Sequence, residues 1–121
     1  MKAVVVFAHG SRDPLWRAPI EAVAQAVQAR APETPVRCAY LELCEPSLPE
    51  AVQDLVAKGA TAIRVLPVFF GMGRHAREDL PELLRDLAAQ YPGVALGVLP
   101  TVGEDPRVTH LLAQLALEEP A

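Results

Sequence analysis

The segment PVFFGMGRHAREDLPELL, residues 67–84, begins as an apolar run and ends as a helix-forming pattern. Its first four residues are typical of a buried strand, whereas Leu80, Leu83 and Leu84 recur at the spacing of an amphipathic helix. Two glycines and His75 separate the two patterns. The segment therefore predicts a strand that leads into a helix through a glycine hinge, with a polar side chain at the junction.

The same strand–helix unit recurs along the whole chain. Apolar runs that predict strands occupy residues 2–8, 35–43, 61–70 and 94–100. Each run is followed by apolar residues at helical spacing. Strands that alternate with such helices predict a parallel sheet with helices on both faces. We therefore expect an α/β fold, with one four-stranded parallel sheet in a single domain spanning residues 1–121.

Capping residues predict where the helices begin. Ser47 and Glu50 form a capping box before the second helix, and Asp105 is a suitable cap for the last one. In the first helix, Pro19 is expected in the first turn, because proline is tolerated there. That helix is therefore predicted to start at Pro19 and not at Pro14.

Composition narrows the class of protein. The chain has 121 residues, of which 51% are hydrophobic and 21% charged, as in ordinary globular domains. No apolar run approaches the roughly 20 residues that span a bilayer, and the first residues read as a strand, not a signal peptide. A net charge of -4 without a basic face argues against nucleic acid. Cys38 and Cys44 form no CxxC motif, which predicts a reduced, cytoplasmic setting and no cysteine chemistry.

Three polar side chains follow three successive predicted strands. His9 follows the first, Glu42 the second and His75 the third. Ligands of open parallel sheets bind at the carboxyl ends of the strands, so all three lie at one predicted edge. Two imidazoles and a carboxylate suit a borderline divalent ion such as Co²⁺, Ni²⁺, Fe²⁺ or Zn²⁺. Each could instead be a hydrogen-bonded or solvated strand end, and His110, inside the last helix, is expected to be structural.

Glycines and arginines surround the two histidines. Gly71 and Gly73 either let the backbone approach a bulky ligand or serve only a tight turn. Four arginines flank the histidine loops, namely Arg12, Arg17, Arg74 and Arg77. Arginine forms bidentate contacts with carboxylates, so these residues predict a polycarboxylate ligand, unless they form a solvated rim.

Two motifs carry a family resemblance. FAHGSRDP (7–14) and PVFFGMGRHAREDLP (67–81) together resemble the short form of the CbiX chelatases, a class II family that inserts a metal into sirohydrochlorin. The similarity covers essentially the whole chain, including YLELCEPSLPEAV (40–52). Leu80 departs from the isoleucine that is frequent in the family. The matching positions of the second motif are Pro67, Phe69, Phe70, Gly73, His75, Asp79 and Pro81.

The resemblance implies a sirohydrochlorin chelatase built as a single chelatase-like lobe. His9 and His75 would be the catalytic, metal-handling residues, and Glu42 would assist as a ligand. The metal, cobalt first and nickel or iron next, would be a substrate, and no prosthetic group is implied. The residues expected to contact the tetrapyrrole are Gly10, Ser11, Arg12, Gly73 and Arg74.

The resemblance also implies a homodimer, because longer relatives contain two such lobes facing each other across a cleft. The apolar residues beside the loops would contact the second copy or the macrocycle, although Trp16 could equally belong to a local mini-core. These residues are Leu15, Trp16, Phe70 and Met72.

Other functions remain open. A non-catalytic carrier of metal or tetrapyrrole is the main alternative, because binding residues do not prove turnover. A hydrolase would need a G-x-S-x-G elbow, which the sequence lacks. A signalling domain of similar topology would need an acidic cluster after the first strand, where this chain has the segment 9–12, HGSR.

Overall fold

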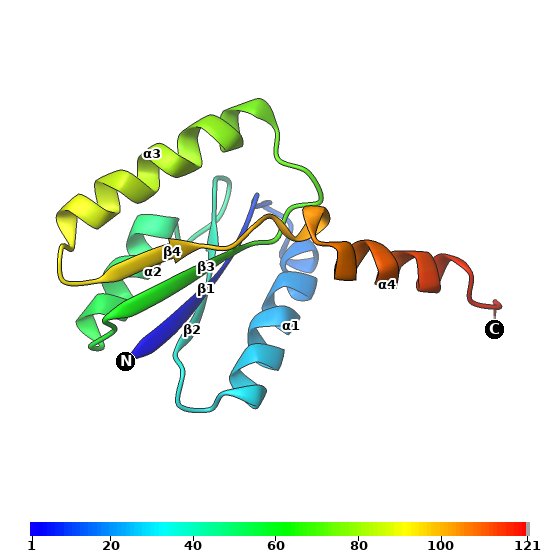
Figure 1. Ribbon diagram of the computed structural model, residues 1–121, viewed down its shortest axis with the longest axis horizontal. Coiled ribbons are helices and arrows are strands. Elements are labelled where there is room, and N and C mark those ends of the chain that lie inside the picture. Colours follow the sequence, from blue (N-terminus) through cyan, green and yellow to red (C-terminus); the bar gives the residue numbers. More distant parts are fainter. Residues whose placement is uncertain (121) are drawn as a thin grey trace.

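The computed structural model describes residues 1–120, in which strands and helices alternate as the sequence predicts (Figure 1). The strands are β1 (Lys2–Ala8), β2 (Val36–Tyr40), β3 (Ala62–Pro67) and β4 (Ala95–Val98). The helices are α1 (Pro14–Arg30), α2 (Leu48–Ala57), α3 (Arg74–Gln90) and α4 (Pro106–Ala116), with a short 3₁₀ helix, η1 (Val102–Glu104), before α4. The predicted α/β fold is confirmed. β2 and β3 end before their apolar runs do, because the chain leaves the sheet to form the loops of the site.

The sheet is parallel throughout, in the order β2–β1–β3–β4. β1 therefore lies inside the sheet, where Val5 is aligned with Arg37 of β2 on one side and with Val65 of β3 on the other. Every residue from Val5 to Ala8 is buried. A strand that is covered on both faces needs apolar side chains at every position, which explains the unbroken apolar run of β1.

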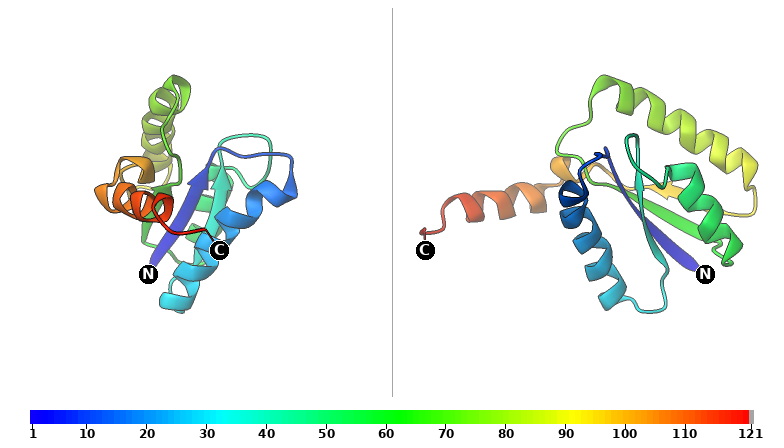
Figure 2. Two further views of the ribbon diagram at one scale, coloured as in Figure 1. Left: turned by 90° about the vertical axis from the view of Figure 1, so that its right-hand side faces the viewer. Right: turned by 180° about the vertical axis from the view of Figure 1, so that it is seen from behind.

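Helices cover the two faces of the sheet unequally (Figure 2). One face packs against α2 and α3, in a core that contains Phe7, Val52 and Leu80. The other face packs against α1, in a smaller core that contains Val6 and Ile20. Neighbouring residues of β1 thus serve opposite cores, as the alternation of side chains along a strand requires.

The capping box of α2 is confirmed. The Ser47 hydroxyl accepts a hydrogen bond from the backbone N–H of Glu50 at 3.3 Å, and the Glu50 carboxylate accepts one from the N–H of Ser47 at 3.0 Å. Because the backbone of Ser47 hydrogen-bonds the carboxylate, the pKa of Glu50 is lowered. The cap places the start of α2 beside the loop that carries Glu42.

The predicted start of the first helix at Pro19 is wrong. α1 begins at Pro14, because Asp13 caps it by accepting a hydrogen bond from the N–H of Leu15 at 2.9 Å. Pro19 lies inside the helix, where it has no N–H to donate to the carbonyl of Leu15. The added turn brings Trp16 against Tyr40, with ring centroids 6.2 Å apart.

The last helix forms as predicted but does not cover the sheet. Asp105 caps α4 by accepting a hydrogen bond from the N–H of Arg107 at 2.8 Å. The helix projects away from the body of the molecule, and none of its residues is buried (Figures 1 and 2). None of the helices within residues 1–120 has the length and apolar character needed to cross a membrane.

Candidate functional site

A cavity of about 570 Å³ opens at the carboxyl edge of the sheet. It lies among the loops that follow β1, β2 and β3 and is closed on one side by the start of α3. Its lining residues are His9, Leu41, Glu42, Phe69, Gly71, Gly73, Arg74, His75, Ala76 and Asp79. The structure thus places the three predicted ligands in one cavity, while their roles remain predictions.

His9 and Glu42 are in direct contact. The Nε2 atom of His9 lies 3.1 Å from Oε1 of Glu42, and its Nδ1 atom lies 3.3 Å from the carbonyl oxygen of Gly10. Both ring nitrogens therefore face oxygen acceptors, whereas a neutral imidazole can donate a hydrogen bond from only one of them. With a neutral ring, one nitrogen lone pair points at an oxygen.

A cation would relieve this mismatch, either as a proton on the His9 ring or as a metal ion shared by the two side chains. Nitrogen and oxygen ligands lie about 2.0–2.2 Å from a bound divalent ion such as Zn²⁺, so two neighbouring ligands of one ion are roughly 3 Å apart. The 3.1 Å separation of His9 and Glu42 is that of a direct hydrogen bond, and it also matches the spacing of two ligands of one ion. Their side chains are 51% and 56% exposed, so an incoming ion can reach them from solvent.

The contact between His9 and Glu42 depends on Gly10, where the loop after β1 lies against the loop after β2. Gly10 is buried at φ +107, and a Cβ atom there would lie 1.8 Å from the carbonyl oxygen of Glu42. The N–H of Glu42 also donates a hydrogen bond to the carbonyl of His9 at 3.0 Å. Only a residue without a side chain allows this approach and this φ, so Gly10 positions the pair.

His75 reaches the cavity from a different element. It is the second residue of α3, two positions after the Gly73 cap residue, and it is exposed. No three His, Cys, Asp or Glu side chains within residues 1–120 are placed to hold one ion together. A single copy of the chain therefore brings His9 and Glu42 into contact but does not add His75 as a third ligand.

Asp79 is a cavity residue that the spacing of potential ligands did not single out. It matched the family motif, yet no role was assigned to it. Its carboxylate lies four residues after His75 on α3, and both line the cavity. Residues at this spacing share one face of a helix, so the pattern H-x-x-x-D was the available signal.

The arginines that flank the histidine loops in sequence line different hollows of the structure. Arg74 lines the cavity, with its Nε atom 3.1 Å from Oε1 of Glu78. Arg77 lines a separate hollow beside Leu80 and Thr101. Arg17 lines another hollow together with Cys38 and Tyr40. Of the four, only Arg74 lines the cavity, because helical geometry directs Arg77 to a different face of α3.

Some of the other residues expected to contact the substrate line the cavity and some do not. Gly73 lines the cavity with Arg74, and Gly10 is buried against the backbone of Glu42. Ser11 and Arg12 are not among the cavity-lining residues. The Ser11 hydroxyl instead accepts a hydrogen bond from the N–H of Asp13 at 3.1 Å. Contact of Ser11 and Arg12 with a substrate therefore stays a prediction.

The two cysteines, Tyr40 and His110 do not line the cavity. Cys38 and Cys44 are free thiols that pack against the α1 core. Burial raises the pKa of the Cys38 thiol, and burial together with the nearby Cys38 raises the pKa of Tyr40 to about 12. Both groups are thus held in their neutral forms. His110 is exposed on α4, which does not pack on the sheet, and it does not line the cavity, so its structural role stays a prediction.

Comparison with known sequences gives matches along the chain. The CbiX family model matches residues 3–119. The sirohydrochlorin cobaltochelatase of Methanopyrus kandleri is 39% identical over 84 residues, which are 69% of this chain and 59% of that protein. The sirohydrochlorin cobaltochelatase of Sulfolobus acidocaldarius is 27% identical over 96% of this chain and 90% of that protein. The match to the M. kandleri protein thus spans less than two thirds of its length.

Solved structures share the fold. The CbiX protein from Marinobacter aquaeolei VT8 has a TM-score of 0.82 and 30% identity, and the match covers 96% of this chain and 94% of that chain. The sirohydrochlorin chelatase SirB from Bacillus subtilis subspecies spizizenii, in complex with cobalt, has a TM-score of 0.74 and 28% identity. That match covers 95% of this chain but 51% of SirB. On the family match, the fold and the two histidine loops, the chain belongs to the CbiX family.

Proposed function

We propose that the protein is a sirohydrochlorin chelatase, which inserts a divalent metal ion into the tetrapyrrole. The observation that carries the proposal is the His9–Glu42 contact, at the spacing of two metal ligands, in a cavity that His75 also lines. The names of the relatives support cobalt as the first candidate metal. Nickel and iron are the alternatives, because imidazole and carboxylate ligands accept all three.

The reaction exchanges two pyrrole protons for one metal ion. We propose that His9 and Glu42 receive the ion after it loses water, and that His75 accepts the two pyrrole protons in turn and passes each of them to solvent. A neutral imidazole is suited to either task, because its nitrogen lone pair binds a metal or a proton. No prosthetic group is required, since the metal and the tetrapyrrole are both substrates.

The proposed active form is a homodimer. A single lobe offers an exposed cavity, whereas a flat macrocycle is held best between two walls that exclude water. The chain covers about one half of SirB, which supports the pairing of two lobes. Leu15 and Phe70 are 81% and 74% exposed beside the cavity loops and are candidates for the second wall. Trp16 packs on Tyr40 and Met72 on the sheet core, which favours local packing for these two.

Turnover distinguishes this proposal from a carrier on the same fold. With sirohydrochlorin and Co²⁺ in large excess over protein, we expect the absorbance change of metal insertion to continue through many equivalents per chain. The uncatalysed rate without protein is the control. A change that stops at one equivalent would support the carrier, and a rate equal to the control would contradict both.

We further propose a cytoplasmic location, supported by the two free thiols.

Replacing Arg74 with alanine should weaken substrate binding. Arg74 is the cavity-lining arginine, and its side chain is 85% exposed, so solvent screens its contact with a substrate carboxylate. We expect KM for sirohydrochlorin to rise by roughly threefold to tenfold, which corresponds to about 1 kcal/mol, with kcat almost unchanged. Steady-state kinetics would measure both constants. Arg85→Ala, on the same helix but away from the cavity lining, is the control; an equal KM in both variants contradicts the role of Arg74.

A further inference from the structure

Leu43 has an unfavourable backbone conformation next to the cavity. Its φ is +70, and within residues 1–120 it is the only residue other than glycine whose φ is positive. In this left-handed region the Cβ atom of an ordinary residue comes too close to the following carbonyl oxygen, so glycine, asparagine and aspartate are the usual occupants. On backbone grounds alone, leucine is a poor residue for this position.

The hydrogen bonds of the loop after β2 explain why the chain turns here. The N–H of Glu42 donates to the carbonyl of His9 at 3.0 Å, which holds the start of the loop beside the loop after β1. Four residues later, the carbonyl of Pro46 accepts a hydrogen bond from the N–H of Tyr40 at 2.9 Å. The chain therefore returns to the end of β2 within a few residues, and the left-handed conformation of Leu43 is part of this reversal.

The fold needs the turn but not the leucine side chain. Leu43 is 49% exposed. It is not among the residues that pack against either hydrophobic core, whereas Leu41 packs against one core and Cys44 against the other. A glycine would make the same turn without backbone strain and without exposing an apolar side chain.

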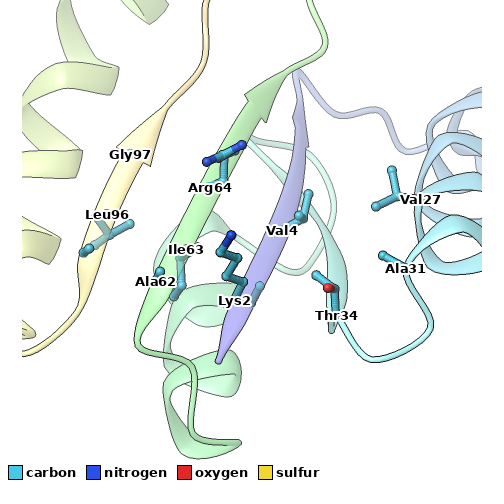
Figure 3. A pocket seen from close by; sticks show the side chains of 12 residues that line it. Lys2, Val4, Val27, Ala31, Thr34, Ala62, Ile63, Arg64, Leu96 and Gly97 are labelled. Carbon is cyan, nitrogen blue, oxygen red and sulfur yellow. The ribbon is translucent and has the colours of Figure 1, made fainter.

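Other exposed apolar side chains follow from regular secondary structure. A hollow of about 440 Å³ beside α1, for example, is lined mainly by residues of β1, β3, β4 and α1 (Figure 3). In these elements, the alternation of a strand or the repeat of a helix sets which side chains reach the surface. Leu43 lies in neither a strand nor a helix. No such repeat accounts for an apolar side chain at this position.

The neighbours of Leu43 in the chain place it at the edge of the cavity. It directly follows Glu42, which lines the cavity and lies 3.1 Å from Nε2 of His9, whereas Leu43 is not itself a lining residue. Consecutive Cα atoms are about 3.8 Å apart, so the two residues are immediate neighbours in space as well. A tetrapyrrole whose central metal is held by His9 and Glu42 extends outward from that point and reaches residues beside the pair.

We propose that Leu43 is an apolar contact for the ring of the tetrapyrrole. The inference rests on the proposed function and deepens it, because it assigns a residue that recognises the ring and not the metal. A ring bound at the pair covers leucine surface that is exposed in the free protein, and burial of apolar surface favours binding. Backbone strain of this kind is typical of ligand sites, where it holds a side chain in position before the ligand arrives. Arg74 is suited to the carboxylates of the substrate, whereas Leu43 is suited to its apolar ring.

Three substitutions separate the side chain of Leu43 from its backbone. Leu43→Gly removes the contact and the strain, Leu43→Ala removes the contact and keeps the strain, and Leu43→Met keeps both and is the matched control. We expect KM for sirohydrochlorin to rise by roughly threefold to tenfold in the glycine and alanine variants. The methionine variant should stay within about twofold of the wild type, because methionine replaces leucine at similar volume. KM for Co²⁺ should be almost unchanged in all three variants, because His9 and Glu42 are retained.

Stability should follow the backbone and not the side chain. Glycine relieves the left-handed strain, although the greater freedom of its unfolded chain offsets part of this gain. The urea midpoint of Leu43→Gly should therefore be equal to that of the wild type or higher. The alanine and methionine variants should unfold close to the wild-type midpoint, because the side chain that they change is outside both cores. Weaker substrate binding at undiminished stability would identify a side chain that serves the ligand.

Two results would overturn the role of Leu43. One is an unchanged KM for sirohydrochlorin in both the glycine and the alanine variants. The other is a urea midpoint that falls in both of these variants, which would make the leucine a packing group of its own loop.

Direct titration, followed by the fluorescence of metal-free sirohydrochlorin, separates this inference from the proposed function. Binding that weakens in the glycine and alanine variants of a protein without turnover would overturn the proposed function and retain the contact. Turnover by the wild type with equal binding in all variants would overturn the contact and retain the proposed function.

Discussion

Replacing His75 with alanine should lower the rate of metal insertion by about 100-fold or more, because a positioned proton acceptor contributes at least that factor. His9→Ala should lower it comparably, since it removes half of the pair that has ligand spacing. Both side chains are exposed, so neither change should alter the free energy of unfolding by more than about 0.5 kcal/mol. The absorbance change of sirohydrochlorin with Co²⁺ measures the rate, and urea unfolding checks the fold.

His110→Ala is the matched control for both variants. His110 is also an exposed histidine, but it lies on α4 and does not line the cavity. Its removal should leave the rate unchanged. Full activity in both His9→Ala and His75→Ala would remove the assignment of the cavity as the site of metal insertion.

Replacing Gly10 with alanine should destabilise the protein more than the same change at Gly59, the other glycine of positive φ. The backbone there has φ +107, and the new methyl group would lie 1.8 Å from the Glu42 carbonyl oxygen. Left-handed backbone costs about 1–2 kcal/mol for alanine, and overpacking adds about 1–3 kcal/mol. We expect a loss of about 2–5 kcal/mol in the free energy of unfolding, together with displacement of Glu42 from His9 and reduced metal insertion.

Gly59→Ala separates the cost of the left-handed backbone from the cost of overpacking. Gly59 has φ +98, but a Cβ atom there meets nothing within 4 Å. Only the backbone term applies, so this control should lose about 1–2 kcal/mol and keep its activity. Urea unfolding of the two variants measures the difference. If Gly10→Ala is no less stable than Gly59→Ala, the close approach of the β1 and β2 loops does not position the site.

Together these variants examine the site at two levels. The histidine variants remove the side chains proposed to contact metal or substrate, whereas Gly10→Ala retains those side chains but moves the loop that aligns them. A site that needs the His9–Glu42 contact should fail in both ways. A site that needs only the two imidazoles should lose activity in the histidine variants but retain much of it in Gly10→Ala.

Local patterns were sufficient for most of the fold. The unbroken apolar run of β1 predicted a strand covered on both faces, and the Ser47–Glu50 pair predicted the start of α2. These features depend on neighbouring residues and on alternation along the chain. The start of α1 was missed because two prolines compete, and the Asp13 cap favours Pro14 over Pro19.

The positions of individual side chains were predicted less well than the strands and helices. Arg17 and Arg77 flank the histidine loops in sequence, yet Arg17 lies near Cys38 and Arg77 lies beside Thr101. The sequence distance of an arginine from a loop does not determine which side of its helix it occupies. Asp79 shows the reverse case, because its helical spacing from His75 would have placed it in the cavity.

By itself, the sequence determined the order of strands and helices and the edge at which His9, Glu42 and His75 gather, because both follow from local periodicity and from the rule that parallel strands end together. Only the tertiary structure decided that Gly10 brings His9 to Glu42, and that η1 turns α4 away from the sheet. These two features depend on close backbone contacts between segments far apart in the chain, at Gly10 with Glu42 and at Gly103 with Phe70. No local pattern encodes such contacts, because a glycine in the sequence does not show which backbone will lie against it.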